Sequence, residues 1–455
     1  MLVTSLDYYF FLTLIFFAFW MFRSQRLTPL VLVCAANLFF YSRWGATYLG
    51  LIPAASGIDY LLARRIAAGK SPIARRMAVS ASIVLNLGLI AACRYVAALT
   101  GTRASLVLPL SLSFYAFQAL TYTIDIYRGD SKPAGYLQYF ASVSFFPTTL
   151  AGPITRVSSL TSQWTWKGVV LTGEEGSRAL FLIAMGLAKK FLIADYLGTN
   201  LVNRVFDLPT LYSGGDVLVA VYAYAFQLYY DFSGYSDIAI GSALLLGIRL
   251  PANFNAPYRA QNLADFWKRW HISFSSWLRE YLYFSLPGKR TRWMPYVGLI
   301  ITMALGGIWH GAGWTFLIWG LLHGIGLAVF RLWQSQRRGV APGGRIARIG
   351  AGLLTFHYVL LGWIFFRAAS LGVAFNILRQ IGSLKYSFDN ATPAFLLVLT
   401  LAIAGHFVPA AWYNGSIIRF ARTPALVQAG ALALLALAIR YVAATGAAPF
   451  IYSRF

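Results

Sequence analysis

Long apolar segments separated by short polar ones occupy almost the whole chain. About 20 apolar residues cross the hydrocarbon core of a bilayer, and several of the segments reach that length. Others are too short, or too interrupted by glycine and proline, to span it alone. We therefore expect an all-α integral membrane protein with about eleven to thirteen membrane-embedded helices. The apolar segments lie near residues 7–22, 28–41, 46–62, 77–98, 105–123, 138–155, 178–202, 214–230, 233–249, 293–309, 312–333, 350–366, 393–411 and 424–443.

Two stretches depart from this pattern. The first, 144–152, holds Pro147 and is followed by Pro153, and it is predicted to be re-entrant because broken backbone at membrane depth must lie inside protein or beside a cavity. The second, 265–281, reads DFWKRWHISFSSWLREY. It predicts an amphipathic helix in the membrane interface with its tryptophans at headgroup depth. Its polar stripe comprises Asp265, Lys268, Arg269, Ser276, Arg279 and Glu280, of which the first and third are spaced to pair.

Composition agrees with a membrane protein. Of 455 residues, 58% are hydrophobic and 11% charged, whereas soluble proteins carry roughly 25% charged residues. The formal charge of +24 lies in short loops beside apolar segments, as the positive-inside rule describes. Such loops favour anionic lipid and the cytoplasm over nucleic acid, so no nucleic-acid partner is expected. Cys34 and Cys93 lie inside apolar runs and are expected to be unpaired thiols.

The basic residues also predict the topology. Arg23 and Arg26 follow the first apolar segment, whereas a cleaved signal peptide carries its charge before that segment. The N-terminus is therefore expected outside, which places the basic loop at 64–76 in the cytoplasm. The stretch 331–348 is predicted to be a second large cytoplasmic loop. We expect residues 1–455 to form one transmembrane domain.

His310 is the strongest candidate for chemistry, because it interrupts the longest apolar run within GGIWHGAG at 306–313. Ionisable groups at membrane depth face a cavity or a partner, and the glycines allow the backbone to break or another helix to approach. A neutral histidine bonded to a carbonyl is the structural alternative. His271 is either packed or a second active-site residue. Gly320 and Gly324 favour tight helix packing around His323, and His357 and His406 are assigned to structure.

Asp231 and Asp237, in YDFSGYSDIAIG at 230–241, form the other polar group at membrane depth. A buried carboxylate needs a partner, so they either cap a helix after a break or form the polar wall of a channel. The chain lacks HExxH, GxSxG and GxGxxG patterns. Zinc chemistry, a nucleophile elbow and dinucleotide binding therefore lack their usual signatures, and no metal is expected.

At this point the sequence resembles membrane-bound O-acyltransferases. The resemblance is carried by WKRWHISFSSWLREYLY at 267–283 and GGIWHGAGWTFLIWGLLHG at 306–324, and it is closest to the bacterial branch that modifies cell-surface polymers, including alginate O-acetylation proteins. Ser453 and Arg454 replace a more usual Phe-Gln pair, and FSLPG at 284–288 replaces an Ile-Pro-Leu-Gly-Gly turn. Further matches lie at 108–129, 145–154, 230–241, 253–267, 363–368 and 450–455.

The resemblance implies a ring of membrane helices around a thin centre, where a cytoplasmic channel meets an outer funnel. His310 takes the place of the family's central histidine and His271 that of the supporting one. The implied reaction moves an acyl group, expected to be acetyl, from a cytoplasmic thioester such as acetyl-CoA to hydroxyls of a cell-surface polysaccharide. The donor is a substrate, and no bound cofactor is expected. The transfer crosses the bacterial inner membrane, directly or through a periplasmic acyltransferase partner.

This reaction agrees with the chemistry of the residues. A buried neutral imidazole can take the proton of an attacking hydroxyl, and the developing oxyanion needs donors. The candidates are the indoles of Trp309 and Trp314, backbone N–H groups near Gly311, and His271. The expected substrate-binding residues are Trp309, Trp314, Asp231, Asp237 and Asn262.

Other functions stay open at this level. Peptidoglycan and teichoic acid are compatible acceptors. A transporter would also bury histidines and broken helices, but the chain lacks a matching pair of interrupted segments in two halves. A scaffold of a polymer-export complex would not need the spacing of the two histidine motifs.

Overall fold

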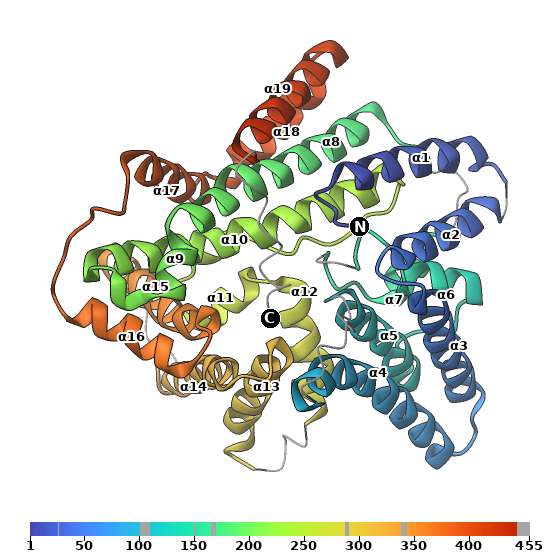
Figure 1. Ribbon diagram of the computed structural model, residues 1–455. Helices are drawn as coiled ribbons and strands as arrows, with labels where there is room; N and C mark the ends of the chain where they lie inside the picture. The colour runs from blue at the N-terminus through green and yellow to red at the C-terminus, as the bar shows by residue number, and fades with distance from the viewer. Residues whose placement is uncertain are drawn as a thin grey trace. The chain divides into compact units, whose positions relative to one another are not determined.

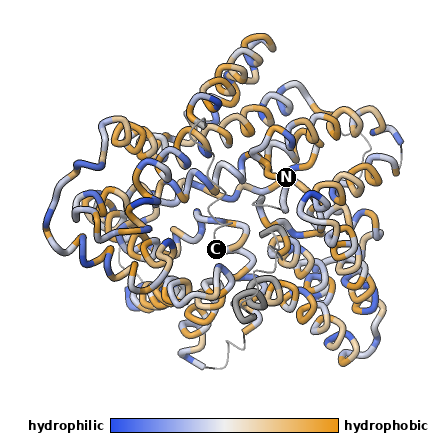
Figure 2. The backbone as a smooth tube through the Cα atoms, in the orientation of Figure 1, coloured by the Kyte–Doolittle hydropathy of each residue, from blue (hydrophilic) through white to orange (hydrophobic). Residues whose placement is uncertain are grey.

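The computed structural model describes residues 1–25, 27–100, 110–149, 152–164, 170–286, 291–337 and 344–443, and within these ranges it contains helices and no strands (Figure 1). Hydrophobic residues are frequent along the helices (Figure 2). The chain is therefore an all-α integral membrane protein. Arg26, the side chain of Cys93, residues 338–343 of the basic stretch and residues 444–455 lie outside the described part.

The chain divides into two compact units, which we call the first and second units. The first comprises Met1–Gly186, Tyr235–Ala252 and Ile417–Thr423, and the second Leu187–Gly234, Asn253–Ser416 and the chain from Pro424 onward. The helices that begin in the first unit are α1 (Leu6–Phe22), α2 (Thr28–Ser42), α3 (Thr47–Ala68), α4 (Pro72–Thr100), α5 (Leu110–Arg128), α6 (Tyr136–Val143), α7 (Val157–Thr161) and α8 (Gly173–Ala188).

The second unit contains the remaining elements. They are η1 (Lys189–Asp195), η2 (Gly198–Val202), α9 (Asn203–Asp207), η3 (Pro209–Leu211), α10 (Gly214–Leu245, which continues into the first unit), η4 (Pro257–Arg259), α11 (Leu263–Arg269), α12 (Ile272–Trp277), η5 (Leu278–Leu282), η6 (Tyr283–Ser285), α13 (Met294–His310), α14 (Trp314–Gln336), α15 (Arg345–Arg367), α16 (Leu371–Gly382), α17 (Pro393–His406), α18 (Ala410–Arg422, ending in the first unit) and α19 (Ala425–Ala443).

Four described helices are long and apolar enough to cross a bilayer alone. They are α14, α15, residues 72–92 of α4 and residues 425–442 of α19, and the pair α17 and α18, bent by 95°, makes a fifth if it is taken as one span. Helices α1, α2 and α13 are apolar but shorter. The larger number of membrane-embedded helices expected from the sequence stays a prediction.

The broken backbone predicted for 144–152 is found at residues 144–149, whereas a re-entrant path in the membrane stays a prediction. Helix α6 ends at Val143, and residues 144–149 are buried without helical structure. Asn37 of α2 supports the break: its Nδ2 donates to Ser144 Oγ at 3.0 Å, and its Oδ1 accepts from the Phe146 backbone N–H at 2.9 Å. The Gln118 Nε2 of α5 donates to Thr148 Oγ1 at 3.2 Å. Side chains of neighbouring helices thus supply the hydrogen bonds that irregular backbone needs at depth.

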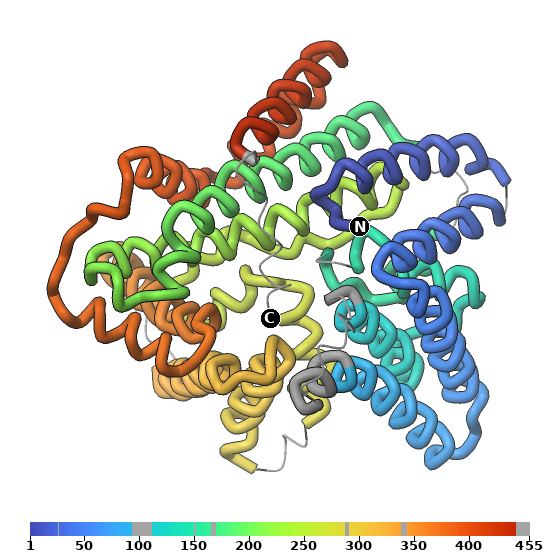
Figure 3. The backbone as a smooth tube through the Cα atoms, viewed as in Figure 1, coloured from blue at the N-terminus to red at the C-terminus, as the bar shows by residue number. Residues whose placement is uncertain are grey.

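Two helix predictions were wrong. Residues 214–230 and 233–249 were expected to be separate, but α10 continues unbroken through Ser233 and Gly234 (Figure 3). Glycine weakens a helix interior by only about 1 kcal/mol, and this part of α10 is buried on both sides of Gly234, so packing outweighs the local cost. The stretch 265–281, expected to be one helix, is instead divided at Trp270 and His271 into α11 and α12.

The division of 265–281 has a visible cause. The Asn255 N–H donates to the Arg269 carbonyl at 2.9 Å and the Ile272 N–H donates to the Asn253 carbonyl at 2.8 Å. Hydrogen bonds to the backbone of residues 253–255 thus replace helical hydrogen bonds at this point. The aromatic face is also covered by protein, since Trp267, Trp270 and Trp277 are each 9% exposed or less. The tryptophans therefore face protein, and their place at headgroup depth stays a prediction. The predicted pair of Asp265 and Arg269 is confirmed at 2.8 Å.

Candidate active site

His310 is held by close contact between α13 and α14. An added Cβ at Gly307 would lie 2.3 Å from the Phe316 carbonyl oxygen, and one at Gly320 would lie 2.4 Å from the Met303 carbonyl oxygen. At Gly324 it would lie 2.7 Å from the Ile300 Cα. The two helices therefore touch backbone to backbone, which confirms the packing predicted from Gly320 and Gly324. We call this contact the glycine seam. It fixes the end of α13, where His310 is the last residue.

Aromatic rings enclose His310, whose residue surface is 3% exposed. Its ring centroid lies 4.5 Å from that of Trp309, 5.1 Å from that of Trp319 on α14 and 5.0 Å from that of Phe366 on α15. A site of this kind excludes water, so charges that develop there interact more strongly than they would in solvent. The enclosure suits a neutral imidazole that moves a proton.

His271 is fixed in an uncommon backbone conformation between α11 and α12. Its φ is +40°, in the left-handed region that costs a non-glycine residue of order 1–3 kcal/mol. The Asn253 Oδ1 accepts from the Ser273 N–H at 3.2 Å and from Ser273 Oγ at 2.9 Å. The His271 Nδ1 lies 3.2 Å from the same oxygen and therefore donates to it, which leaves Nε2 as the basic nitrogen.

Burial lowers the pKa of His271 to about 3. Helices α11 and α12 have 7 and 6 residues, too few to cross a bilayer. Because its pKa lies below physiological pH, the His271 imidazole is neutral there. A neutral ring with a fixed tautomer can accept or share a proton at one defined nitrogen.

Phe274 brings the two histidines into one site. Its ring stacks on His271 with centroids 5.1 Å apart and lies 4.5 Å from Trp309 and 5.9 Å from His310. Phe232 on α10 also packs against His271, with ring centroids 4.6 Å apart and the ring planes at 73°. The structure thus gathers three of the predicted residues, His271, Trp309 and His310, around one phenylalanine.

A buried ion cluster of Lys190, Asp195 and Asp231 lies in the same unit and was missed from the sequence. The Lys190 Nζ is 2.8 Å from Asp195 Oδ1 and 2.7 Å from Asp231 Oδ1, and the lysine side chain is 2% exposed. Lys190 and Asp195 are five residues apart in the π-helix η1, whose i to i+5 bonding brings such residues to one face. A lysine inside the apolar run at 178–202 is the signal that could have identified it.

The cluster gives Asp231 the partner that a buried carboxylate needs, in this case the Lys190 ammonium group. Asp231 precedes Phe232, which touches His271, so the cluster borders the aromatic wall of the site. Asp237, farther along α10, belongs to the first unit and is partly exposed. The two aspartates therefore occupy different surroundings.

The remaining predicted residues differ in position. Trp314 begins α14 and is 69% exposed, whereas Trp309 is 8% exposed. Asn262 caps α11, since its Oδ1 accepts from the Asp265 N–H at 2.8 Å. A substrate contact for either residue stays a prediction.

Three other histidines have structural partners, in agreement with their assignment. The His323 Nδ1 accepts from the Trp267 indole N–H at 3.3 Å. The His406 Nε2 accepts from the Tyr258 N–H at 3.1 Å. His357 is exposed, and its Nε2 lies 2.6 Å from the Tyr222 hydroxyl.

Comparison with known proteins identifies the class. The model of the membrane-bound O-acyltransferase family matches residues 92–373. The chain is 37% identical over 392 residues to a probable alginate O-acetylase of Azotobacter vinelandii, covering 82% of this chain and 76% of that protein. It is 35% identical over 401 residues to the peptidoglycan O-acetyltransferase of Helicobacter pylori, covering 80% and 76%.

A more distant relative carries a different group. The teichoic acid D-alanyltransferase of Bacillus subtilis is 30% identical over 279 residues, covering 56% of this chain and 68% of that protein. The molecule is thus an acyltransferase embedded in a membrane. It belongs to the membrane-bound O-acyltransferase family.

Proposed function

We propose that this protein transfers an acetyl group from a cytoplasmic thioester, such as acetyl-CoA, to hydroxyl groups of a cell-surface polysaccharide. The observation that carries the proposal is the buried site in which His310, Trp309 and His271 surround Phe274. Two relatives that align over about four-fifths of the chain are named as O-acetyl-transferring enzymes, which favours acetyl over D-alanyl. The basic loops favour the bacterial inner membrane with the N-terminus outside.

In the proposed reaction His310 is the general base. One imidazole nitrogen takes the proton of the acceptor hydroxyl as its oxygen attacks the thioester carbonyl. The tetrahedral intermediate then collapses, the carbon–sulfur bond breaks, and the thiolate recovers the proton from His310. The products are an O-acetyl ester and a free thiol. The aromatic enclosure keeps water from competing as the nucleophile.

The oxyanion of the intermediate needs a hydrogen-bond donor. We assign this role to the Trp309 indole N–H, because Trp309 is buried beside His310 and Trp314 is exposed. His271 is proposed as a supporting residue, held in one tautomer by Asn253. The ion cluster around Lys190 positions the α10 wall and takes no part in proton transfer.

Peptidoglycan is a second candidate acceptor, because the Helicobacter pylori relative aligns as extensively as the alginate O-acetylase. A periplasmic acyltransferase that receives the acetyl group and completes the transfer is a further proposal. Both acceptors supply a sugar hydroxyl, so the chemistry at His310 is the same.

Release of free thiol from acetyl-CoA by protein in nanodiscs tests the proposal. His310→Ala is expected to lower the rate about 10²–10⁴-fold, the contribution of a general base. His357→Ala is the matched control, because His357 is an exposed histidine of the same unit, and it is expected to retain the wild-type rate. His271→Gln is expected to cause a smaller loss, mainly in kcat.

The outcomes separate the competing functions. A His310→Ala protein that is folded and as active as wild type would refute the mechanism. Thiol release that depends on added oligosaccharide of alginate or of peptidoglycan would identify the acceptor, and release that depends on a periplasmic partner would establish the relay. Wild-type protein that releases no thiol with any of these additions would favour a transporter or a scaffold.

A further inference from the structure

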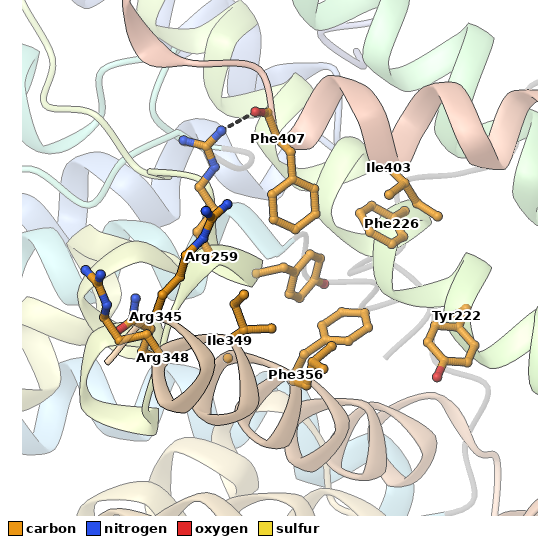
Figure 4. A pocket seen from close by; sticks show the side chains of 13 residues that line it. Tyr222, Phe226, Arg259, Arg345, Arg348, Ile349, Phe356, Ile403 and Phe407 are labelled. Atoms are coloured by element: carbon orange, nitrogen blue, oxygen red, sulfur yellow. Dashed lines mark hydrogen bonds between the residues drawn. The ribbon is translucent and has the colours of Figure 1, made fainter. Parts of the chain in front are cut away.

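A cavity in the second unit is separate from the candidate active site. It has a volume of about 630 Å³ and lies between α10, α15 and α17 (Figure 4), within the range of roughly 300–1,000 Å³ typical of sites that hold small molecules. Neither His271 nor His310 is among its described lining residues. Most of the wall is apolar or aromatic and includes Phe226, Ile349, Leu353, Phe356 and Ile403.

The two tyrosines in the wall offer ring faces rather than hydroxyls. The Tyr222 hydroxyl lies 2.6 Å from His357 Nε2, and the Tyr258 hydroxyl donates to the Ala225 carbonyl at 2.6 Å. Their polar atoms are thus occupied by the protein. The wall is therefore suited to hydrocarbon over most of its area.

One end of the cavity is strongly basic. Arg259, Arg345 and Arg348 line it, and Figure 4 shows them on the side opposite Tyr222. Arg259 is held in place because its guanidinium donates to the Phe407 carbonyl. Arg345 and Arg348 lie in the first turn of α15, where the helix dipole adds positive potential. Among the described residues, no acidic side chain lines the cavity.

This arrangement of a basic end and an apolar body matches one class of ligand. We propose that the cavity binds an anionic phospholipid, with its phosphate at Arg259, Arg345 and Arg348 and an acyl chain along Phe226 and Phe356. Helix α15 is long and apolar enough to span a bilayer. Its basic start lies within the stretch 331–348, which the sequence predicts to be cytoplasmic. On that side anionic lipids give the membrane surface its negative potential.

The proposal has a structural consequence for the second unit. A lipid chain in the cavity would contact α10, α15 and α17 together, adding to the hydrogen bonds that already join α10 to α15 at Tyr222 and to α17 at Tyr230. Phe226 also contacts His406 at the end of α17 and Tyr258 in η4. The lipid would therefore lie next to the residues through which α17 contacts η4. Its binding is expected to raise the melting temperature of the protein without entering the reaction.

The test measures lipid binding to the purified full chain in detergent by native mass spectrometry and by melting temperature. Phosphatidylglycerol is expected to bind one per chain and to stabilise the protein, and phosphatidylcholine with the same acyl chains is not. Arg345→Gln and Arg348→Gln are each expected to weaken phosphatidylglycerol binding roughly fivefold, the effect of about one basic residue near an anionic surface. Arg337→Gln, in the same basic stretch but outside the cavity, is the matched control and is expected to bind as wild type does.

A second pair of variants tests the apolar body of the cavity. Gly352 lines it, and a Cβ there would meet only the Ala260 carbonyl oxygen at 3.9 Å, so Gly352→Leu is expected to fill the cavity and abolish binding while the protein folds. Gly350, two residues earlier, faces open space and lines no part of the cavity, so Gly350→Leu is expected to leave binding intact.

Several results would overturn the proposal. They are equal binding of phosphatidylcholine, unchanged binding by the arginine and Gly352 variants, an equal rise in melting temperature with inorganic phosphate alone, or displacement of the lipid by coenzyme A. The last two would reassign the basic end to a free anion or to the nucleotide part of the donor.

Discussion

The two units bury a carboxylate in different ways. In the first unit Asp59 is fully buried and bound by neutral groups: Ser82 Oγ donates at 2.6 Å and Asn86 Nδ2 at 2.9 Å. In the second unit Asp231 is 1% exposed and lies 2.7 Å from the ammonium of Lys190. One carboxylate is accommodated by hydrogen-bond donors and the other by a counter-ion.

The difference decides how each cluster responds to change. A neutral donor that is lost costs about one hydrogen bond, because Asp59 keeps its other neutral donor and no second charge is left behind. An ion that is lost leaves its partner charged in a medium of low dielectric constant, which costs several kcal/mol. We therefore expect the ion cluster around Lys190 to tolerate the loss of one member less well than the neutral cluster around Asp59.

The largest effect is expected for Lys190→Met. It removes the ammonium group that contacts both Asp195 and Asp231, and the expected loss of stability is about 3–5 kcal/mol. The measurement is thermal or denaturant unfolding in detergent. Lys190→Met combined with Asp195→Asn and Asp231→Asn removes all three charges together and is expected to recover most of that loss. If the triple variant is no more stable than the single one, the charge explanation fails.

Asn253→Ala sharpens the comparison with a neutral group in the second unit. Its Oδ1 accepts from Ser273 and His271, and an unsatisfied buried donor costs about 1–3 kcal/mol. We expect a loss in that range and a fall in kcat, because the His271 tautomer is no longer fixed. Asn255→Ala, in the same loop with an exposed side chain, is the control and is expected to change neither. Equal effects of the two variants would argue against a special role for the Asn253 amide.

The pH dependence of stability is expected to come next. The pKa of His271 is about 3 in the folded protein against an ordinary value of 6.5, so below pH 6.5 the unfolded chain takes up a proton that the folded ring does not. The contribution of His271 to stability is fully present above that pH and falls by up to about 1.4 kcal/mol per pH unit below it. Melting temperatures of wild type and His271→Gln between about pH 7.5 and 5 check this. The variant is expected to have the flatter profile, and His357→Gln the wild-type one.

The smallest effect is expected for Asp59→Asn in the first unit. The new amide oxygen still accepts from Ser82, and Asn86 can rotate its side-chain amide to accept from the new NH₂ group, giving up its bond to the Ser82 carbonyl. The expected change is about 1 kcal/mol or less, measured by the same unfolding assay. A loss as large as that of Lys190→Met would remove the distinction between the two clusters.

The sequence predicted the elements better than their breaks. The histidine motifs, the small-residue contact at Gly320 and Gly324, and the broken backbone after residue 143 were all evident from local pattern. The break at His271 was not, because it depends on backbone bonds from 253–255, a segment whose pairing no helical period reveals. The continuity of α10 was missed for the opposite reason: Ser233 and Gly234 suggest a break that packing prevents.

The candidate site was predicted in part. His310, Trp309 and His271 lie together, but Phe274, which connects them, was assigned only to the aromatic face of an interfacial helix. Lys190 was missed because it is one of two adjacent lysines, Lys189 and Lys190, in an apolar run. The π-helix that turns Lys190 toward Asp231 has no signature in the residue pattern. Its partner on α10 is distant in sequence, so only the folded chain brings the pair together.

The glycine seam restricts how the active site can open. Main-chain atoms of α13 and α14 are in direct contact at Gly307, Gly320 and Gly324, so the two helices cannot slide past each other by exchanging side-chain rotamers. They are expected to move as one rigid hairpin, with His310 stationary at its turn. Motion that admits a donor or releases a thiol must then come from the short segments on the other side of Phe274, α11, α12 and η5. Turnover would be limited by the flexing of those segments, on the microsecond-to-millisecond scale of gating motions.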